Sequence, residues 1–107
     1  MKYLYIDDIR NPGTNKDWII VRSSHEAILW LNENGCPDYI SFDHDLGGDD
    51  TSMKIVKFMV NQDLNFPGWI PLDFKYNVHS ANPVGASNID GYLKSYFKQK
   101  DKNEIKN

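Results

Sequence analysis

Cysteine, long apolar runs and positive charge are all scarce in this sequence. Cys36 is the single cysteine, so no internal disulfide can form. No segment approaches the roughly 18 consecutive apolar residues that a membrane-spanning helix needs. The start, MKYLYIDD, reaches its carboxylates before it builds the apolar region of a secretory signal. These absences predict a cytoplasmic protein that does not insert into a membrane.

Basic residues are outnumbered by acidic ones, 12 to 15, which gives a formal net charge of −3. Binding to long nucleic acid depends mainly on basic side chains that replace phosphate counterions. An extended nucleic-acid surface is therefore excluded, whereas a small anionic ligand at one local site is compatible with this charge. The sequence also lacks the GxxxxGK[ST] phosphate loop, which argues against an ordinary nucleoside triphosphatase.

Four short apolar segments predict strands, at residues 2–6, 18–22, 39–42 and 74–80. The last segment alternates apolar and polar residues, which indicates one solvated face and hence an edge strand. Residues 23–35 predict a helix, with Ser23 and Glu26 at capping-box spacing and Gly35 as its stop. A second helix is predicted to begin near residues 51–52, and a third from about Ser87.

Strands that alternate with helices indicate one α/β domain with a mainly parallel sheet of about four strands and three helices. We assign residues 1–98 to this domain, and residues 99–107 to a polar, lysine-rich tail that is either a fraying helix end or disordered. The sequence predicts no helix between the first two strands. These strands could pair antiparallel, or the proline-containing loop between them could cross the sheet without a helix.

Polar side chains follow three of the predicted strands at their carboxyl ends, the edge where open parallel sheets bind ligands. They are Asp7, Asp8 and Arg10 after the first strand, Asp43, His44 and Asp45 after the third, and His79 and Ser80 after the fourth. A strand order of two, one, three, four would bring the first aspartates beside Asp43. Carboxylates so close together repel one another, so we expect either a cation between them or raised pKa values.

The expected metal ligands are Asp7, Asp8, Asp43 and Asp45. Oxygen ligands without cysteine favour Mg²⁺, with Mn²⁺ or Ca²⁺ as substitutes, although the neighbouring histidines leave a softer metal open. Aspartates at strand ends also commonly cap loops and helices. For Asp49 and Asp50, which immediately precede the second helix, capping is the preferred interpretation.

His79 and His44 are candidates for proton transfer because imidazole titrates near neutral pH. Hydrolysis of a cyclic phosphate needs such a pair, one group to activate water and one to protonate the departing ribose oxygen. Arg10 and Arg22 could bind a phosphate through their planar guanidinium groups, or one of them could neutralise the carboxylates. The segment NPVGAS, which includes Gly85, could present backbone amides to an anion before the last helix.

The segments YIDD, ISFD and VHSA resemble the strand ends of response-regulator receiver domains, which have a flavodoxin-like fold. The resemblance implies that Asp7 and Asp8 hold Mg²⁺, that Asp43 occupies the phospho-acceptor position and that Ser80 contacts a phosphoryl oxygen. Two features depart from the receiver pattern. A proline loop replaces the usual first helix, and there is no fifth strand with its active-site lysine, which disfavours a phosphorelay receiver.

The chain resembles more closely the family of cyclic-phosphate-processing receiver-like domains, whose motifs are DDxR.P, RS..EA...L, DHDLG and HSANP.G..N. The corresponding segments here are DDIRNP, RSSHEAILWL, FDHDLGG and VHSANPVGASN, and the similarity extends over residues 3–97. The resemblance implies a site built from Asp7, Asp8, Arg10, Asp43, His44, Asp45, His79, Ser80 and Asn82.

From these observations we predict a metal-dependent phosphoesterase that acts on a cyclic phosphate of a nucleotide or an RNA end. In this hypothesis the catalytic residues are His79, His44 and Asp43, and the phosphate is bound by Arg10, Arg22, Ser80, Asn82 and Gly85. The alternative is a non-enzymatic receiver-like module that binds a phosphorylated partner or sequesters a cyclic nucleotide. The sequence leaves the preferred nucleotide and the oligomeric state open.

Overall fold

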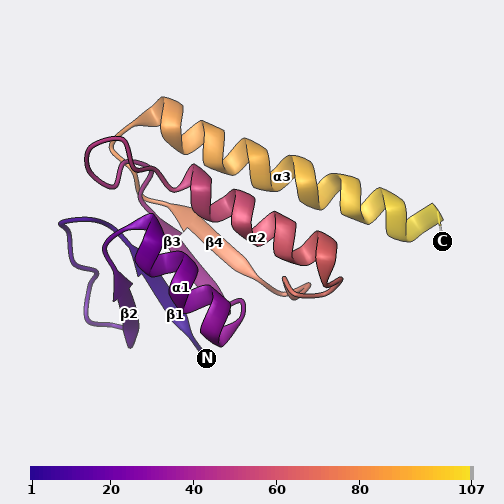
Figure 1. The fold of residues 1–107 in the computed structure, drawn as a ribbon, viewed down its shortest axis with the longest axis horizontal. Helices are drawn as coiled ribbons and strands as arrows, with labels where there is room; N and C mark the ends of the chain where they lie inside the picture. Colours follow the sequence, from indigo (N-terminus) through magenta and orange to yellow (C-terminus); the bar gives the residue numbers. More distant parts are fainter. Residues whose placement is uncertain (107) are drawn as a thin grey trace.

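Four parallel strands form the sheet. The computed structural model describes the backbone of residues 1–106 and the side chains of residues 1–100. The strands β1 (Tyr3–Ile6), β2 (Trp18–Val21), β3 (Tyr39–Phe42) and β4 (Lys75–Val78) lie in the order β2-β1-β3-β4, and every neighbouring pair is parallel (Figure 1). The predicted α/β, flavodoxin-like fold is confirmed, as are the strand order and the position of β4 at an edge.

The connection between β1 and β2, residues 7–17, crosses without a helix. Because β1 and β2 are parallel, the antiparallel alternative is wrong and the helix-free crossing is correct. Arg22 holds this loop in place. Its guanidinium group donates hydrogen bonds to the carbonyl oxygens of Asp7 and Arg10, at 3.3 and 2.7 Å, and to the side chain of Asn11. One side chain with several donors thus satisfies backbone oxygens that a helix would otherwise pair.

The helices are α1 (Ser24–Asn34), α2 (Met53–Asn65) and α3 (Pro83–Lys106). As predicted, the Ser23 side chain caps α1 by accepting a hydrogen bond from the Glu26 amide, and Gly35 ends it with a φ of 81°. None of the helices in the described part of the chain is both long and apolar enough to cross a membrane.

The third helix begins at Pro83, four residues before the predicted start at Ser87. The Asn82 side-chain oxygen accepts a hydrogen bond from the Gly85 amide at 3.1 Å, so Asn82 caps the helix and Pro83 takes the first helical position, where proline is favoured. The helix then continues past residue 98. From residue 101 onward, the side chains of the predicted tail lie outside the described residues, so the boundary at residue 98 stays a prediction.

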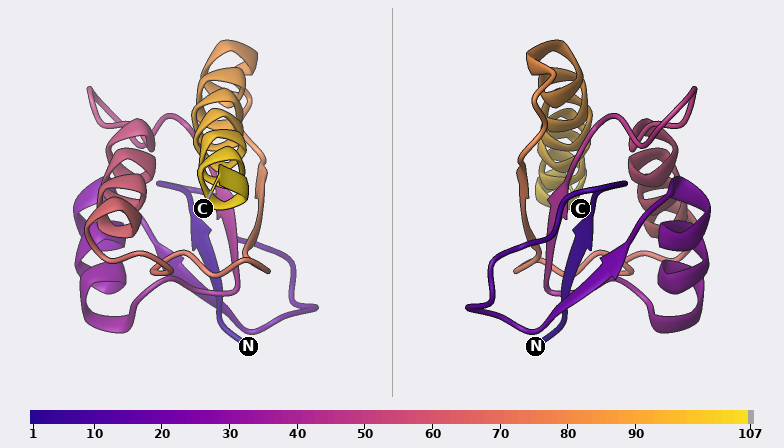
Figure 2. Two further views of the ribbon diagram at one scale, coloured as in Figure 1. Left: turned by 90° about the vertical axis from the view of Figure 1, so that its right-hand side faces the viewer. Right: turned by 90° about the vertical axis from the view of Figure 1, so that its left-hand side faces the viewer.

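All three helices pack on one face of the sheet. Leu4, Ile6, Ile40 and Phe42 point to this face and are fully buried in one apolar cluster with side chains of the three helices, among them Leu31, Ile55, Met59, Ile89 and Leu93. Each such side chain contributes about 1.5–3 kcal/mol through its burial. Figure 2 shows α1 and α2 on one side of the strands and the β1–β2 loop on the other.

The opposite face of the sheet has no helix among the described residues, and we call it the open face. Side chains alternate along a strand, so it receives the residues that do not enter the core. They are Tyr3 and Tyr5 of β1, Trp18 and Ile20 of β2, Tyr39 and Ser41 of β3, and Lys75 and Asn77 of β4. The domain therefore has two layers.

Candidate functional site

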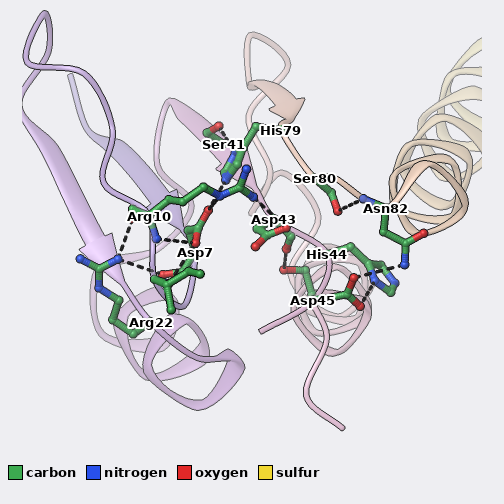
Figure 3. Close-up of polar contacts among 12 residues, drawn as sticks. Asp7, Arg10, Arg22, Ser41, Asp43, His44, Asp45, His79, Ser80 and Asn82 are labelled. Atoms are coloured by element: carbon green, nitrogen blue, oxygen red, sulfur yellow. Dashed lines mark hydrogen bonds and ion pairs between the residues drawn. The ribbon is translucent and has the colours of Figure 1, made fainter. Parts of the chain in front are cut away.

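The polar residues that follow β1, β3 and β4 meet at the carboxyl edge of the sheet, as predicted. Figure 3 shows that their side chains form two groups. The first group consists of Asp7, Arg10, Ser41, Asp43 and His79, and the second consists of His44, Asp45, Ser80 and Asn82.

Asp7 is the centre of the first group and is completely buried. One carboxylate oxygen accepts hydrogen bonds from the amides of Ile9 and Arg10, at 3.0 and 2.8 Å. The other accepts from Nε of Arg10 and Nε2 of His79, at 2.8 and 3.0 Å. Burial alone would raise the pKa of Asp7, but these donors outweigh it and lower the pKa. Asp7 is therefore an ionised carboxylate that organises the β1–β2 loop and holds the side chains of Arg10 and His79.

Arg10 joins the two buried carboxylates. Its guanidinium group lies 2.8 Å from Asp7 through Nε and 3.3 Å from Asp43 through a terminal nitrogen. Of the two roles that the sequence left open for the arginines, the contacts give Arg10 that of neutralising the carboxylates. Arg22 lies on the loop carbonyls described above, so its donors are engaged in shaping the β1–β2 loop. The Arg10 side chain is still 45% exposed, which leaves part of its guanidinium group facing solvent.

His79 is held on three sides. Its Nδ1 lies 2.7 Å from the Ser41 hydroxyl, its Nε2 lies 3.0 Å from Asp7, and its ring stacks on Tyr5 with 4.6 Å between centroids and 6° between planes. An ionised carboxylate only accepts hydrogen bonds, so Nε2 carries a proton, and in the neutral ring Nδ1 accepts from Ser41. Sequence reasoning missed Ser41. Its one signal is a small polar residue within the otherwise large and mainly apolar strand YISF.

His44 forms a second histidine–carboxylate pair. Its Nδ1 lies 3.0 Å from Asp45, and the Asn82 amide donates to the other Asp45 oxygen at 3.2 Å. Hydrogen bonds from His44 and Asn82 lower the pKa of Asp45. Because the carboxylate accepts, Nδ1 carries a proton, and in the neutral ring Nε2 keeps a lone pair. Asp45 was expected to bind metal, but its oxygens are turned to His44 and Asn82 in the second group.

The start of α3 supports this second group. The backbone amide of Asn82 donates a hydrogen bond to the Ser80 hydroxyl oxygen at 3.1 Å, and the backbone amide of Gly85 donates to the side-chain oxygen of Asn82. The Gly85 amide, which was expected to face an anion, is therefore used in the helix cap. Gly85 is buried against the His44 ring, since a Cβ at this position would lie only 2.4 Å from Cγ of His44. The absence of a side chain at residue 85 makes room for the imidazole.

A cation could be held beside the first group. Asp7, Asp8 and Asp43 each offer a carboxylate oxygen, and these oxygens lie within 4.8 Å of one another. Such a set suits a hard ion like Mg²⁺. Asp7 already accepts four hydrogen bonds, which leaves its oxygens little capacity to coordinate a cation. The contacts therefore favour Asp8 and Asp43 as the metal ligands.

Of the pair Asp49 and Asp50, only Asp50 makes capping contacts, and it makes them with a different helix from the one expected. Asp50 accepts hydrogen bonds from both the amide and the hydroxyl group of Ser24, the first residue of α1. It thus caps α1 rather than α2, which it immediately precedes. Asp49 is exposed.

Comparison with known protein families shows the family of the chain. A family model described as the cyclic-phosphate processing receiver domain matches residues 2–95. The chain belongs to this family. The matched residues of the receiver domain include every member of both side-chain groups. Among the curated proteins and the solved structures with which the chain was compared, nothing matches.

Proposed function

We propose that this receiver domain is a metal-dependent phosphoesterase that hydrolyses a cyclic phosphate of a nucleotide or an RNA end. One observation carries the proposal: a cluster of three aspartates and two histidines share the carboxyl edge of the sheet, and each histidine is hydrogen-bonded to its own carboxylate. Membership of a cyclic-phosphate processing family supports the substrate class.

The two histidines would divide the proton transfers. Water adds to phosphorus while one bond between phosphorus and a ribose oxygen breaks. His44 would take the proton of the attacking water, because its Nδ1 is fixed by Asp45 and its Nε2 keeps a lone pair. His79 would act from its imidazolium form, giving the Nε2 proton to the departing oxygen and returning to the neutral ring. Since both of its nitrogens already have partners, its Nε2–H would have to turn from Asp7 to the ligand.

Asp8 and Asp43 would hold the divalent ion, with an oxygen of Asp7 within 4.8 Å of theirs. Mg²⁺ is the first ion to test, and Mn²⁺ the second. When bound, such an ion polarises the phosphate oxygens as a Lewis acid. Arg10 would orient the phosphate through the exposed part of its guanidinium group, with the Ser80 hydroxyl and the Asn82 amide on the other side of Asp43.

The test is turnover of defined substrates. Purified protein is incubated with 2′,3′-cyclic nucleotides, 3′,5′-cyclic nucleotides and an RNA with a cyclic-phosphate end, each with Mg²⁺, Mn²⁺ or EDTA, and products are identified by mass spectrometry. We expect hydrolysis that EDTA abolishes. His44→Ala should lower turnover by about 10²–10⁴-fold. His25→Ala is the matched control, because His25 is exposed on α1 and should leave turnover unchanged.

Recovery of every substrate intact under all conditions would contradict the enzyme. One observation favours a second candidate in that case. Arg10 already bridges Asp7 and Asp43, so a protein side chain supplies positive charge between the carboxylates. A module that sequesters a cyclic nucleotide through Arg10 would bind without turnover, with an affinity that EDTA does not change and that Arg10→Ala lowers.

A further inference from the structure

Aromatic rings cover the open face of the sheet. Trp18, Tyr3 and Tyr39 lie in one row across β2, β1 and β3, and their ring centroids are 5.7 to 6.3 Å apart. All three are half-buried and none packs into the apolar cluster on the helix side. Their mutual contacts are tilted or edge-to-face, which leaves parts of the ring faces unpaired.

This aromatic row is continuous with the candidate site. Tyr5, the next open-face residue of β1, carries the stacked ring of His79, and Trp18 contacts Tyr5 edge-to-face at 5.6 Å. Phe42 pairs with Val78, so Asp43 and His79 lie side by side just past the ends of β3 and β4. Tyr39 begins β3, four residues before Asp43. At about 3.3 Å per residue, the aromatic row lies roughly 13 Å from the carboxyl edge. That span exceeds the separation of the phosphate and the base within one nucleotide.

Positive charge accompanies the aromatic row. Nζ of Lys16 lies 5.2 Å from the Tyr3 ring centroid, and Lys75 continues the row on β4 beside Tyr39. Arg10 adds a positive charge at the carboxyl edge of the sheet, next to Asp7. Aromatic rings interleaved with basic side chains are how proteins bind single-stranded nucleic acid, with bases stacked on rings and phosphodiesters beside cations.

We infer that the open face binds the bases that precede a terminal cyclic phosphate, so that the substrate is the end of a single-stranded RNA rather than a free mononucleotide. The inference rests on the proposed function, because it assumes that the cyclic phosphate occupies the carboxyl edge. The overall charge of −3 is compatible with it, since a few nucleotides need only a local set of cations.

The experiment compares ligands of increasing length. Adenosine 2′,3′-cyclic phosphate is compared with di- and trinucleotides that carry the same end, and binding is measured in the His44→Ala background, where turnover is expected to be lost. We expect affinity to rise about fivefold or more for each added base that stacks. Trp18→Leu and Tyr39→Leu should abolish that rise and leave mononucleotide binding unchanged. Trp69→Leu is the control, since Trp69 packs on the helix side against Phe58.

Several outcomes would overturn the inference. If affinity is independent of length while turnover is observed, the proposed function stands and the rings only shield the sheet. If both variants weaken mononucleotide and trinucleotide equally, the rings support the site without binding bases. If oligonucleotides with hydroxyl ends bind as tightly as those with cyclic ends, and the wild-type protein does not turn over the cyclic ends, the proposed function and this substrate are both refuted. Self-association by sedimentation, lost in Trp18→Leu, would make the face an interface between copies.

Discussion

Gly85→Ala tests whether His44 lies where the structure places it. A Cβ at residue 85 would lie 2.4, 2.5 and 2.8 Å from Cγ, Nδ1 and Cδ2 of the imidazole. Non-bonded carbon atoms keep about 3.5–4.0 Å between them, so the ring must move by about 1 Å or more. The hydrogen bond of 3.0 Å between His44 and Asp45 would then exceed normal hydrogen-bonding length.

The effect should fall on activity more than on stability. Alanine gains about 1 kcal/mol over glycine in a helix, while overpacking costs about 1–3 kcal/mol. The free energy of unfolding should therefore change by less than about 2 kcal/mol, and the fold should persist. A catalytic group displaced by about 1 Å can lose about 100-fold in rate, and we expect a loss of that order in turnover of a cyclic phosphate.

Two measurements check this prediction, turnover of the 2′,3′-cyclic ester and the NMR resonances of the His44 ring. Gly91→Ala is the matched control, because Gly91 lies in the same helix and a Cβ there meets nothing within 4 Å. It should raise stability slightly and leave both readouts unchanged. Wild-type turnover together with an unshifted His44 resonance in Gly85→Ala would refute the reasoning, and the resonance alone decides the packing if the protein proves to bind without turnover.

Three further predictions concern stability and reactivity. The buried Asp63 carboxylate accepts a hydrogen bond from the Tyr96 hydroxyl and pairs with Lys100 at 3.0 Å. Burial would raise the pKa of Asp63, but these partners lower it, so Asp63→Asn should cost about 2 kcal/mol of unfolding free energy at pH 7. This deficit, measured by denaturation, should vanish as the pH falls through the lowered pKa of Asp63. Asp50→Ala should lower the unfolding free energy by about 1–2 kcal/mol through loss of the α1 cap, and an unchanged denaturation midpoint would contradict that role. Burial, and then nearby carboxylates, raise the pKa of Cys36 to about 12, so iodoacetamide should label it only after unfolding, as mass spectrometry would show.

The sequence predicted those features that depend on local pattern. The Ser23 cap and the Gly35 stop defined α1, and the alternation in residues 74–78 placed β4 at an edge. Polar residues at three strand ends favoured the strand order two, one, three, four, because this arrangement would bring Asp7 beside Asp43. The start of α3 was placed too late although its signal was present, since asparagine followed by proline is a typical helix start.

Features that depend on partners far apart in the sequence were not predicted. Ser41 pairs with His79 only because β3 and β4 are neighbours, and no local motif indicates that contact. Asp50 precedes one helix but caps another, which follows from how α1 and α2 pack. The position of Arg10 between two carboxylates was an open alternative that only the folded geometry could decide.

Because the sheet is all-parallel, none of its four strands, within the described residues 1–106, forms a β-hairpin with another. Each strand pairs only with a neighbour that is separated from it by a loop or helix, and β1 pairs with β3 across residues 3–42. Parallel neighbours need such crossovers, and pairings distant in sequence form slowly because loop closure precedes any stabilising contact. No pair of strands can therefore act as a small local nucleus. Strand β1 gains its second neighbour, β3, only after the chain has been synthesised through Phe42, and the sheet is complete only after Val78.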